Sequence, residues 1–166
     1  DTKHANQDDY LRGVVLFDNL PTMIAHDTAT TQNWGVFTFS AGTWSQAATI
    51  SETNIGAVVL DLTIHEGSLF ILAREGTSNL PLLRSYLSTG ISTVAGTGLP
   101  GTTAANGVII SDGVNLYTVT KASGTTLVTV SKSTDDGTNF SAYATYRSNY
   151  APTGKAIYYA QDGGID

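Results

Sequence analysis

The chain has 166 residues, a formal net charge of −6 and no cysteine. This length suits a single domain with its own hydrophobic core. The negative charge disfavours nucleic acid as a partner, and the lack of cysteine excludes disulfides and thiolate metal sites. No apolar stretch approaches the roughly 18 to 20 residues of a membrane-spanning helix, so no membrane insertion is expected.

Composition favours strands and tight turns over helices. Only 13% of the residues are charged, and the chain has 17 glycines and many Ser and Thr residues. Such a profile is typical of β-structure, because helix-forming Glu, Lys and Met are scarce. The chain starts at Asp1, with neither Met nor a charged-then-apolar leader. This indicates that a start residue or signal was removed, or that the chain is a segment of something longer.

The first part of the chain offers four short apolar or alternating runs. They cover residues 14–17, 21–26, 34–40 and 44–50, with Ala41-Gly42 marking the last turn. The middle part offers another four, at 58–64, 68–74, 80–87 and 91–95. Here Glu66-Gly67 is the first turn, since polar-Gly pairs between such runs are strong hairpin signals.

The last part gives the clearest copy, with predicted strands at 108–111, 115–121, 126–131 and 140–146. Asp112-Gly113 is the predicted turn between the first two of these strands, and Asp136-Gly137 is the predicted turn between the last two. A Gly-rich stretch at 96–101 is a linker between copies, because no helix follows it to form a phosphate site. No helix is predicted anywhere.

These copies repeat at a nearly fixed period. Aligning the first turn of each copy places Glu66 48 residues after Asp18, Asp112 46 residues after Glu66, and Asp162 50 residues after Asp112. Four strands per 40 to 50 residues is the blade unit of a β-propeller. We therefore expect an all-β propeller or partial propeller of four-stranded antiparallel blades, with a β-sandwich as the alternative.

The predicted organisation is a single domain over residues 1–166. Blade-like repeats cover about 11–55, 56–104 and 105–152, and the opening strand of a further blade lies at 153–166. Three blades do not close a ring of the usual four to eight. Either an N-terminal arm at 9–12 completes the ring, or the segment belongs to a longer chain, or several copies form the ring together. An unpaired opening strand favours homo-oligomers.

Residues 133–140, Ser-Thr-Asp-Asp-Gly-Thr-Asn-Phe, match the pattern S-x-D-x-G-x-x-[W/F]. In this stretch Ser133 and Asp135 are expected to hydrogen-bond the turn backbone, Gly137 to take positive φ, and Phe140 to pack beneath. The stretch resembles the Asp-box, or bacterial neuraminidase repeat, of a β-propeller family that includes sialidases. The resemblance implies a structural role for the box, and fold more than function.

The residues that could serve catalysis or metal binding lack the sequence context that either role requires. The four arginines, Arg12, Arg74, Arg84 and Arg147, lack the sequence context of a sialidase triad. His65-Glu66 and His26-Asp27 are adjacent pairs whose side chains point to opposite faces of a strand, so neither chelates without a turn. The aspartates at 112, 135 and 136 are explained by turn capping. No catalytic residue, metal or cofactor is predicted.

Aromatic residues are the main binding candidates, because amphipathic rings stack on sugars or anchor protein partners. Trp34, Trp44 and Tyr150 are the least firmly assigned to the core and are the predicted binding residues. Tyr143 and Tyr146 straddle a predicted strand, and most of the aromatic residues are expected to pack within blades. The predicted function is a non-catalytic attachment or assembly module that binds a protein or glycan surface and is secreted, cell-surface or virion-associated. The alternatives are a sialidase-like glycoside hydrolase fragment and a small glycan-binding lectin.

Overall fold

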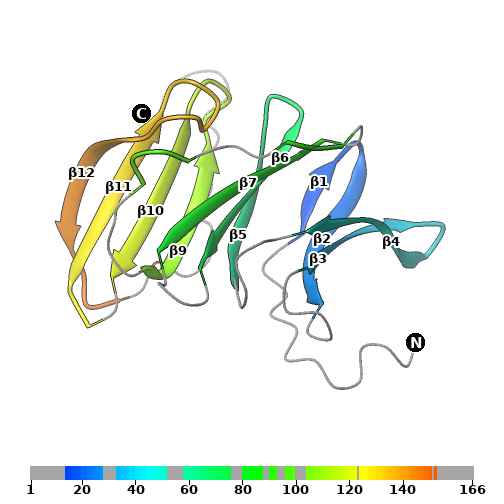
Figure 1. Cartoon of the computed structure of the whole chain (residues 1–166), viewed down its shortest axis with the longest axis horizontal. Helices are drawn as coiled ribbons and strands as arrows, with labels where there is room; N and C mark the ends of the chain where they lie inside the picture. Colours follow the sequence, from blue (N-terminus) through cyan, green and yellow to red (C-terminus); the bar gives the residue numbers. More distant parts are fainter. Residues whose placement is uncertain are drawn as a thin grey trace, which may run out of the picture.

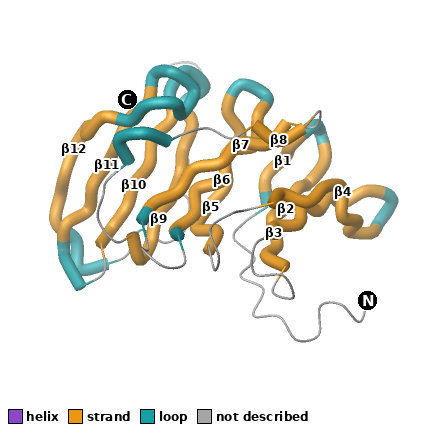
Figure 2. Tube along the Cα trace, viewed as in Figure 1, coloured by secondary structure: helices purple, strands orange, loops and turns teal. Residues whose placement is uncertain are grey.

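Every regular element in the described part of the chain is a β-strand (Figure 2). The computed structural model describes residues 14–27, 33–51, 58–75, 80–87, 90–92, 96–99, 104–122, 124–150 and 152. Within these residues three antiparallel sheets each contain four consecutive strands. The prediction of an all-β fold with four-stranded antiparallel sheets is confirmed.

Two of the connections between strands in the first sheet are two-residue turns. It pairs its strands in chain order: β1 (Val15–Phe17), β2 (Leu20–Asp27), β3 (Asn33–Ser40) and β4 (Thr43–Ser51). Asp18 and Asn19 join β1 to β2, while Ala41 and Gly42 join β3 to β4, and all four have positive φ. Positive φ at both central positions defines the type I′ turn, whose twist matches that of the strands it connects.

The second sheet is buried on both faces. Its strands are β5 (Val58–His65), β6 (Ser68–Arg74), β7 (Pro81–Leu87) and β8 (Gly90–Ser92). In β6 the five central residues are all buried, which is the pattern of a strand packed on both sides. Glu66 and Gly67 form the β5–β6 turn with φ of 46° and 76°.

The third sheet has one buried and one more exposed face. Its strands are β9 (Ala104–Ser111), β10 (Leu116–Ala122), β11 (Leu127–Ser133) and β12 (Ser141–Arg147). Leu116, Thr118 and Thr120 are buried and alternate with partly exposed residues along β10. The predicted tight turn at Asp112-Gly113 is in fact a loop of four residues, 112–115, between β9 and β10.

The three sheets lie side by side, with the second between the other two (Figure 1). The first strands of the sheets lie together, since β5 contacts both β1 and β9. The fourth strands β4 and β12 lie at opposite sides of the molecule (Figure 1). This arrangement is compatible with a partial propeller and also with a β-sandwich.

Two apolar clusters fill the spaces between the sheets. One joins the first and second sheets through residues such as Trp34, Ile24 and Leu62. The other joins the second and third sheets through residues such as Phe70 and Phe140. Within the described residues no sheet closes on itself, and no helix has the length and hydropathy to cross a membrane. The predicted arm at 9–12 and opening strand at 153–166 lie outside the described residues.

Candidate functional site

The turn between β11 and β12 is built by side-chain hydrogen bonds. Ser133 Oγ accepts the Gly137 N–H at 3.0 Å and donates to Asp135 Oδ1 at 2.8 Å. The two Asp135 carboxylate oxygens accept the Asn139 backbone N–H at 2.9 Å and its side-chain Nδ2 at 2.8 Å. The side-chain and backbone hydrogen bonds from Asn139, with that from Ser133, lower the pKa of Asp135. Gly137 has a φ of 79°, as this turn requires.

Phe140 ties this turn to the space between the second and third sheets. Its ring is buried in the cluster that contains Phe70 and Leu83. Its backbone N–H donates to Thr97 O at 2.7 Å, so the linker between the two sheets runs beside the turn. A Cβ at Gly98 would collide with the Phe140 carbonyl, which explains why glycine stands there. The four residues of the box therefore serve folding at this junction.

A polar cluster lies at the same end of the junction. His65, the last residue of β5, has a fully buried side chain. Its Nδ1 lies 2.8 Å from Ser111 Oγ at the end of β9, and its Nε2 lies 3.3 Å from Asp136 Oδ1 in the β11–β12 turn. Glu66 belongs to the same cluster, because its carboxylate lies within 4.8 Å of the His65 and Asp136 ligand atoms.

This cluster contains the residue types of a serine hydrolase but not the access such an enzyme needs. Ser111 Oγ accepts the Gly113 N–H at 3.1 Å as well as contacting His65. Ser111 is only 2% exposed. A nucleophile must reach a substrate carbonyl, so a buried hydroxyl that caps a turn is suited to positioning the imidazole rather than to attack.

The described arginines do not gather at one site. Arg74 lies at the end of β6, Arg84 in β7 and Arg147 at the end of β12. Arg84 Nη1 donates to Leu83 O in the second sheet, whereas Arg147 Nη1 donates to Thr126 Oγ1, just before β11 of the third sheet. Arg12 lies outside the described residues. These positions offer no clamp for a substrate carboxylate, which needs guanidinium groups that converge.

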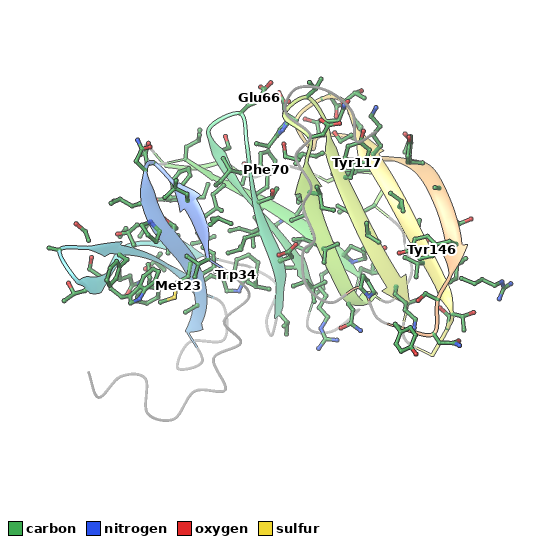
Figure 3. The ribbon with its side chains drawn as sticks, turned by 180° about the vertical axis from the view of Figure 1, so that it is seen from behind. Met23, Trp34, Glu66, Phe70, Tyr117 and Tyr146 are labelled. Atoms are coloured by element: carbon green, nitrogen blue, oxygen red, sulfur yellow. The ribbon has the colours of Figure 1, made fainter. Side chains whose placement is uncertain are left out.

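The three predicted aromatic binding residues lie in different surroundings. The prediction is wrong for Trp34, whose ring is fully buried between the first and second sheets because β3 turns that face inward (Figure 3). Trp44 is 41% exposed and packs against Phe39, with ring centroids 5.3 Å apart. Tyr150 is 83% exposed in the segment after β12. The structure therefore does not bring the three together.

Two tyrosines and a lysine meet on the outer face of the third sheet, and a further tyrosine lies along the same face. The rings of Tyr117 and Tyr143 meet edge to face at 5.8 Å, and Lys132 Nζ lies 5.6 and 5.9 Å from their centroids. Tyr146 pairs with Val128, which lies four residues before Lys132 on β11 and points to the same side of the sheet. Tyr146 therefore faces that side as well. Figure 3 places Tyr117 and Tyr146 toward opposite ends of this sheet. We call Tyr117, Lys132, Tyr143 and Tyr146 the tyrosine face.

The tyrosine face is anchored at one end by Asp112. The Tyr117 hydroxyl donates to Asp112 Oδ2 at 3.0 Å. Burial and this hydrogen bond raise the pKa of Tyr117. Partial burial acts to raise the pKa of Asp112, but hydrogen bonds from Asn115, Val114 and Tyr117 together lower it to about 2. The carboxylate thus holds the first tyrosine in place.

The sequence signals for the tyrosine face were incomplete. Most of the tyrosines were expected to pack within blades, yet Tyr143 and Tyr146 are 63% and 48% exposed. A register shift between Val130 and Ser131 makes Tyr143 an extra residue on β12, so strict alternation wrongly puts Tyr143 and Tyr146 on opposite faces. No protein-family model matches the chain, and no curated protein shows significant sequence similarity to it.

Proposed function

We propose that this chain is a non-catalytic attachment module that binds glycans through the tyrosine face. Its site of action is the outside of a cell or a virus particle. The observation that carries the proposal is the contact of Tyr117, Tyr143 and Lys132 on the outer face of the third sheet, with Tyr146 farther along the same face. Exposed, preorganised rings of this kind offer flat apolar surface together with a hydroxyl that hydrogen-bonds.

The chemistry of the face favours sugars with acidic substituents. Tyr143 and Tyr146 present exposed ring surface on which a sugar ring can stack. The Lys132 ammonium between Tyr117 and Tyr143 would attract a carboxylate or sulfate on the same glycan. Lys132 supplies the cation of this face, while the Asp112 carboxylate at its edge is engaged by the Tyr117 hydroxyl.

Assembly through the same face is the second candidate. All seven residues of β12 are exposed, and this strand forms the edge of the third sheet. An unprotected edge strand beside an aromatic face can pair with another copy of the chain. This would make the tyrosine face a contact between copies rather than a glycan site.

A glycan array separates these functions. Wild-type protein should bind acidic glycans, and Tyr143→Ala and Tyr146→Ala should each weaken that binding at least about tenfold, as for central aromatic contacts. Leu16→Ala is the control, because it removes an exposed apolar side chain from the first sheet and should leave binding unchanged. Absence of binding to every glycan would contradict the proposal. A dimer in sedimentation that Tyr143→Ala dissociates would instead support assembly.

A further inference from the structure

Three potential metal ligands converge where the second and third sheets meet. His65 and Glu66 come from the end of β5 and its turn, whereas Asp136 comes from the β11–β12 turn 71 residues away from His65. One nitrogen or oxygen from each lies within 4.8 Å of the others. Figure 3 shows Glu66 at the tip of the second sheet, next to the loops of the third.

The buried imidazole is held in place from two sides. Nδ1 faces Ser111 Oγ at 2.8 Å, and the Phe70 ring meets the imidazole edge-on with centroids 5.9 Å apart. When Nδ1–H donates to Ser111, the Nε2 lone pair points at Asp136. Metal-binding histidines use this arrangement, because a partner on one nitrogen fixes the ring and leaves the other free to bind.

The geometry fits a small transition-metal ion. The 3.3 Å between His65 Nε2 and Asp136 Oδ1 is close to the separation of two ligands on a tetrahedral zinc, about 3.3–3.4 Å for bonds near 2.0–2.1 Å. Asp136 has 64% of its side chain exposed, and Glu66 is also exposed, so each carboxylate can adjust and water can fill a fourth position. A hydrogen bond between His65 and Asp136 would by itself account for the 3.3 Å distance. It would not account for the Glu66 carboxylate, which lies within 4.8 Å of both.

We propose that His65, Glu66 and Asp136 form a binding site for a divalent transition-metal ion, with Zn²⁺ as the best match. One imidazole with two carboxylates favours zinc over calcium or magnesium, which select oxygen ligands alone. The ion would join the second sheet to the third, because its ligands come from both. This site is independent of the tyrosine face and of the function proposed for it.

Zinc binding should therefore stabilise the fold. Free Zn²⁺ at 100 times its dissociation constant should raise Tm by about 5–10 °C, from the linkage between binding and folding for a domain of this size. Isothermal titration calorimetry with ZnCl₂ should show one such site per chain. CaCl₂ and MgCl₂ at equal concentrations should produce no comparable shift in Tm.

Variants in the exposed ligands test the site with little risk to folding. Glu66→Gln and Asp136→Asn should each weaken zinc binding at least tenfold, because loss of even an outer-shell partner costs about 10–100-fold. Asp18→Asn is the matched control, since Asp18 occupies the corresponding turn position in the first sheet and also has positive φ. His4→Gln with His26→Gln removes the other two histidines and should keep the site.

Two results would overturn the proposal. One is a wild-type protein whose Tm and calorimetric titration do not respond to Zn²⁺. The other is a zinc response that survives in both Glu66→Gln and Asp136→Asn, which would place the bound ion elsewhere on the chain. Circular dichroism of each variant without zinc verifies that the β-fold is retained.

Discussion

The two junctions between sheets are built differently although the sheets share one plan. The first sheet meets the second through a large apolar cluster that includes Trp34, Ile24 and Ile71. The third sheet meets the second through a smaller apolar cluster and a set of polar links. Asp61 Oδ2 accepts the Ile109 N–H at 2.9 Å, and His65 contacts both Ser111 and Asp136.

The two junctions therefore contribute in different ways: one mainly stabilises the fold, and the other mainly fixes how two sheets are placed relative to each other. Apolar burial is strong but non-directional, so the first junction contributes free energy without strictly fixing the offset between the sheets. Hydrogen bonds at the second junction are directional, and each buried partner is costly to leave unpaired. The second junction should therefore respond mainly to the loss of single hydrogen-bond partners, whereas the first should respond mainly to changes in side-chain volume.

The largest effect is expected at the first junction. Trp34→Ala removes the largest fully buried side chain and should lower the free energy of unfolding by about 3–5 kcal/mol. Urea denaturation followed by circular dichroism measures this loss. Trp44→Ala is the control and should cost less than about 1 kcal/mol, because Trp44 is partly exposed. Equal losses in the two variants would contradict the burial of Trp34 between the sheets.

A smaller effect is expected at the second junction. Asp61→Ala leaves the buried Ile109 N–H without its carboxylate partner and should cost about 1.5–3 kcal/mol. Hydrogen exchange gives a local check, because protection of the Ile109 amide should fall more than that of Ile24 in the first sheet. If both amides lose protection equally, the hydrogen bond between Asp61 and Ile109 does not stabilise the second junction more than the rest of the fold.

Much of the fold could be predicted from local patterns. Predicted strands at 58–64 and 68–74 correspond closely to Val58–His65 and Ser68–Arg74, because apolar runs end at polar-Gly turns. The strand predicted at 108–111 begins earlier, at Ala104. Residues 104–107, Ala-Ala-Asn-Gly, carry little apolar signal, and their pairing with β10 puts them in the sheet.

The candidate sites could not be predicted in the same way. The rule that adjacent side chains point to opposite faces applies within a strand, but Glu66 starts a turn with positive φ and returns toward His65. The partners of His65 are 46 and 71 residues away, so only the packing of sheets reveals them. The tyrosine face depends on a bulge in β12, which no periodic pattern indicates.

The smallest expected effect is a decrease in the free energy of unfolding at acidic pH, caused by two carboxyl groups of the third sheet. The pKa of Asp112 is lowered to about 2, and that of Asp135 is also lowered, by hydrogen bonds that favour the ionised form. A carboxyl whose pKa is lower in the folded state contributes stability above its unfolded pKa of about 3.9 and loses it as pH falls through the folded value. The free energy of unfolding should therefore decline between about pH 4 and pH 2.

Asp112→Asn isolates the contribution of one carboxylate to this decline. Above about pH 4 the variant should be slightly less stable than the wild type, and the difference should shrink as pH approaches about 2. The difference should be small, because Asp112 is exposed and solvent screens its interactions. Urea denaturation of both proteins across this pH range measures it. A stability difference that stays constant would mean that the hydrogen bonds to Asp112 do not distinguish its ionised form from its protonated form.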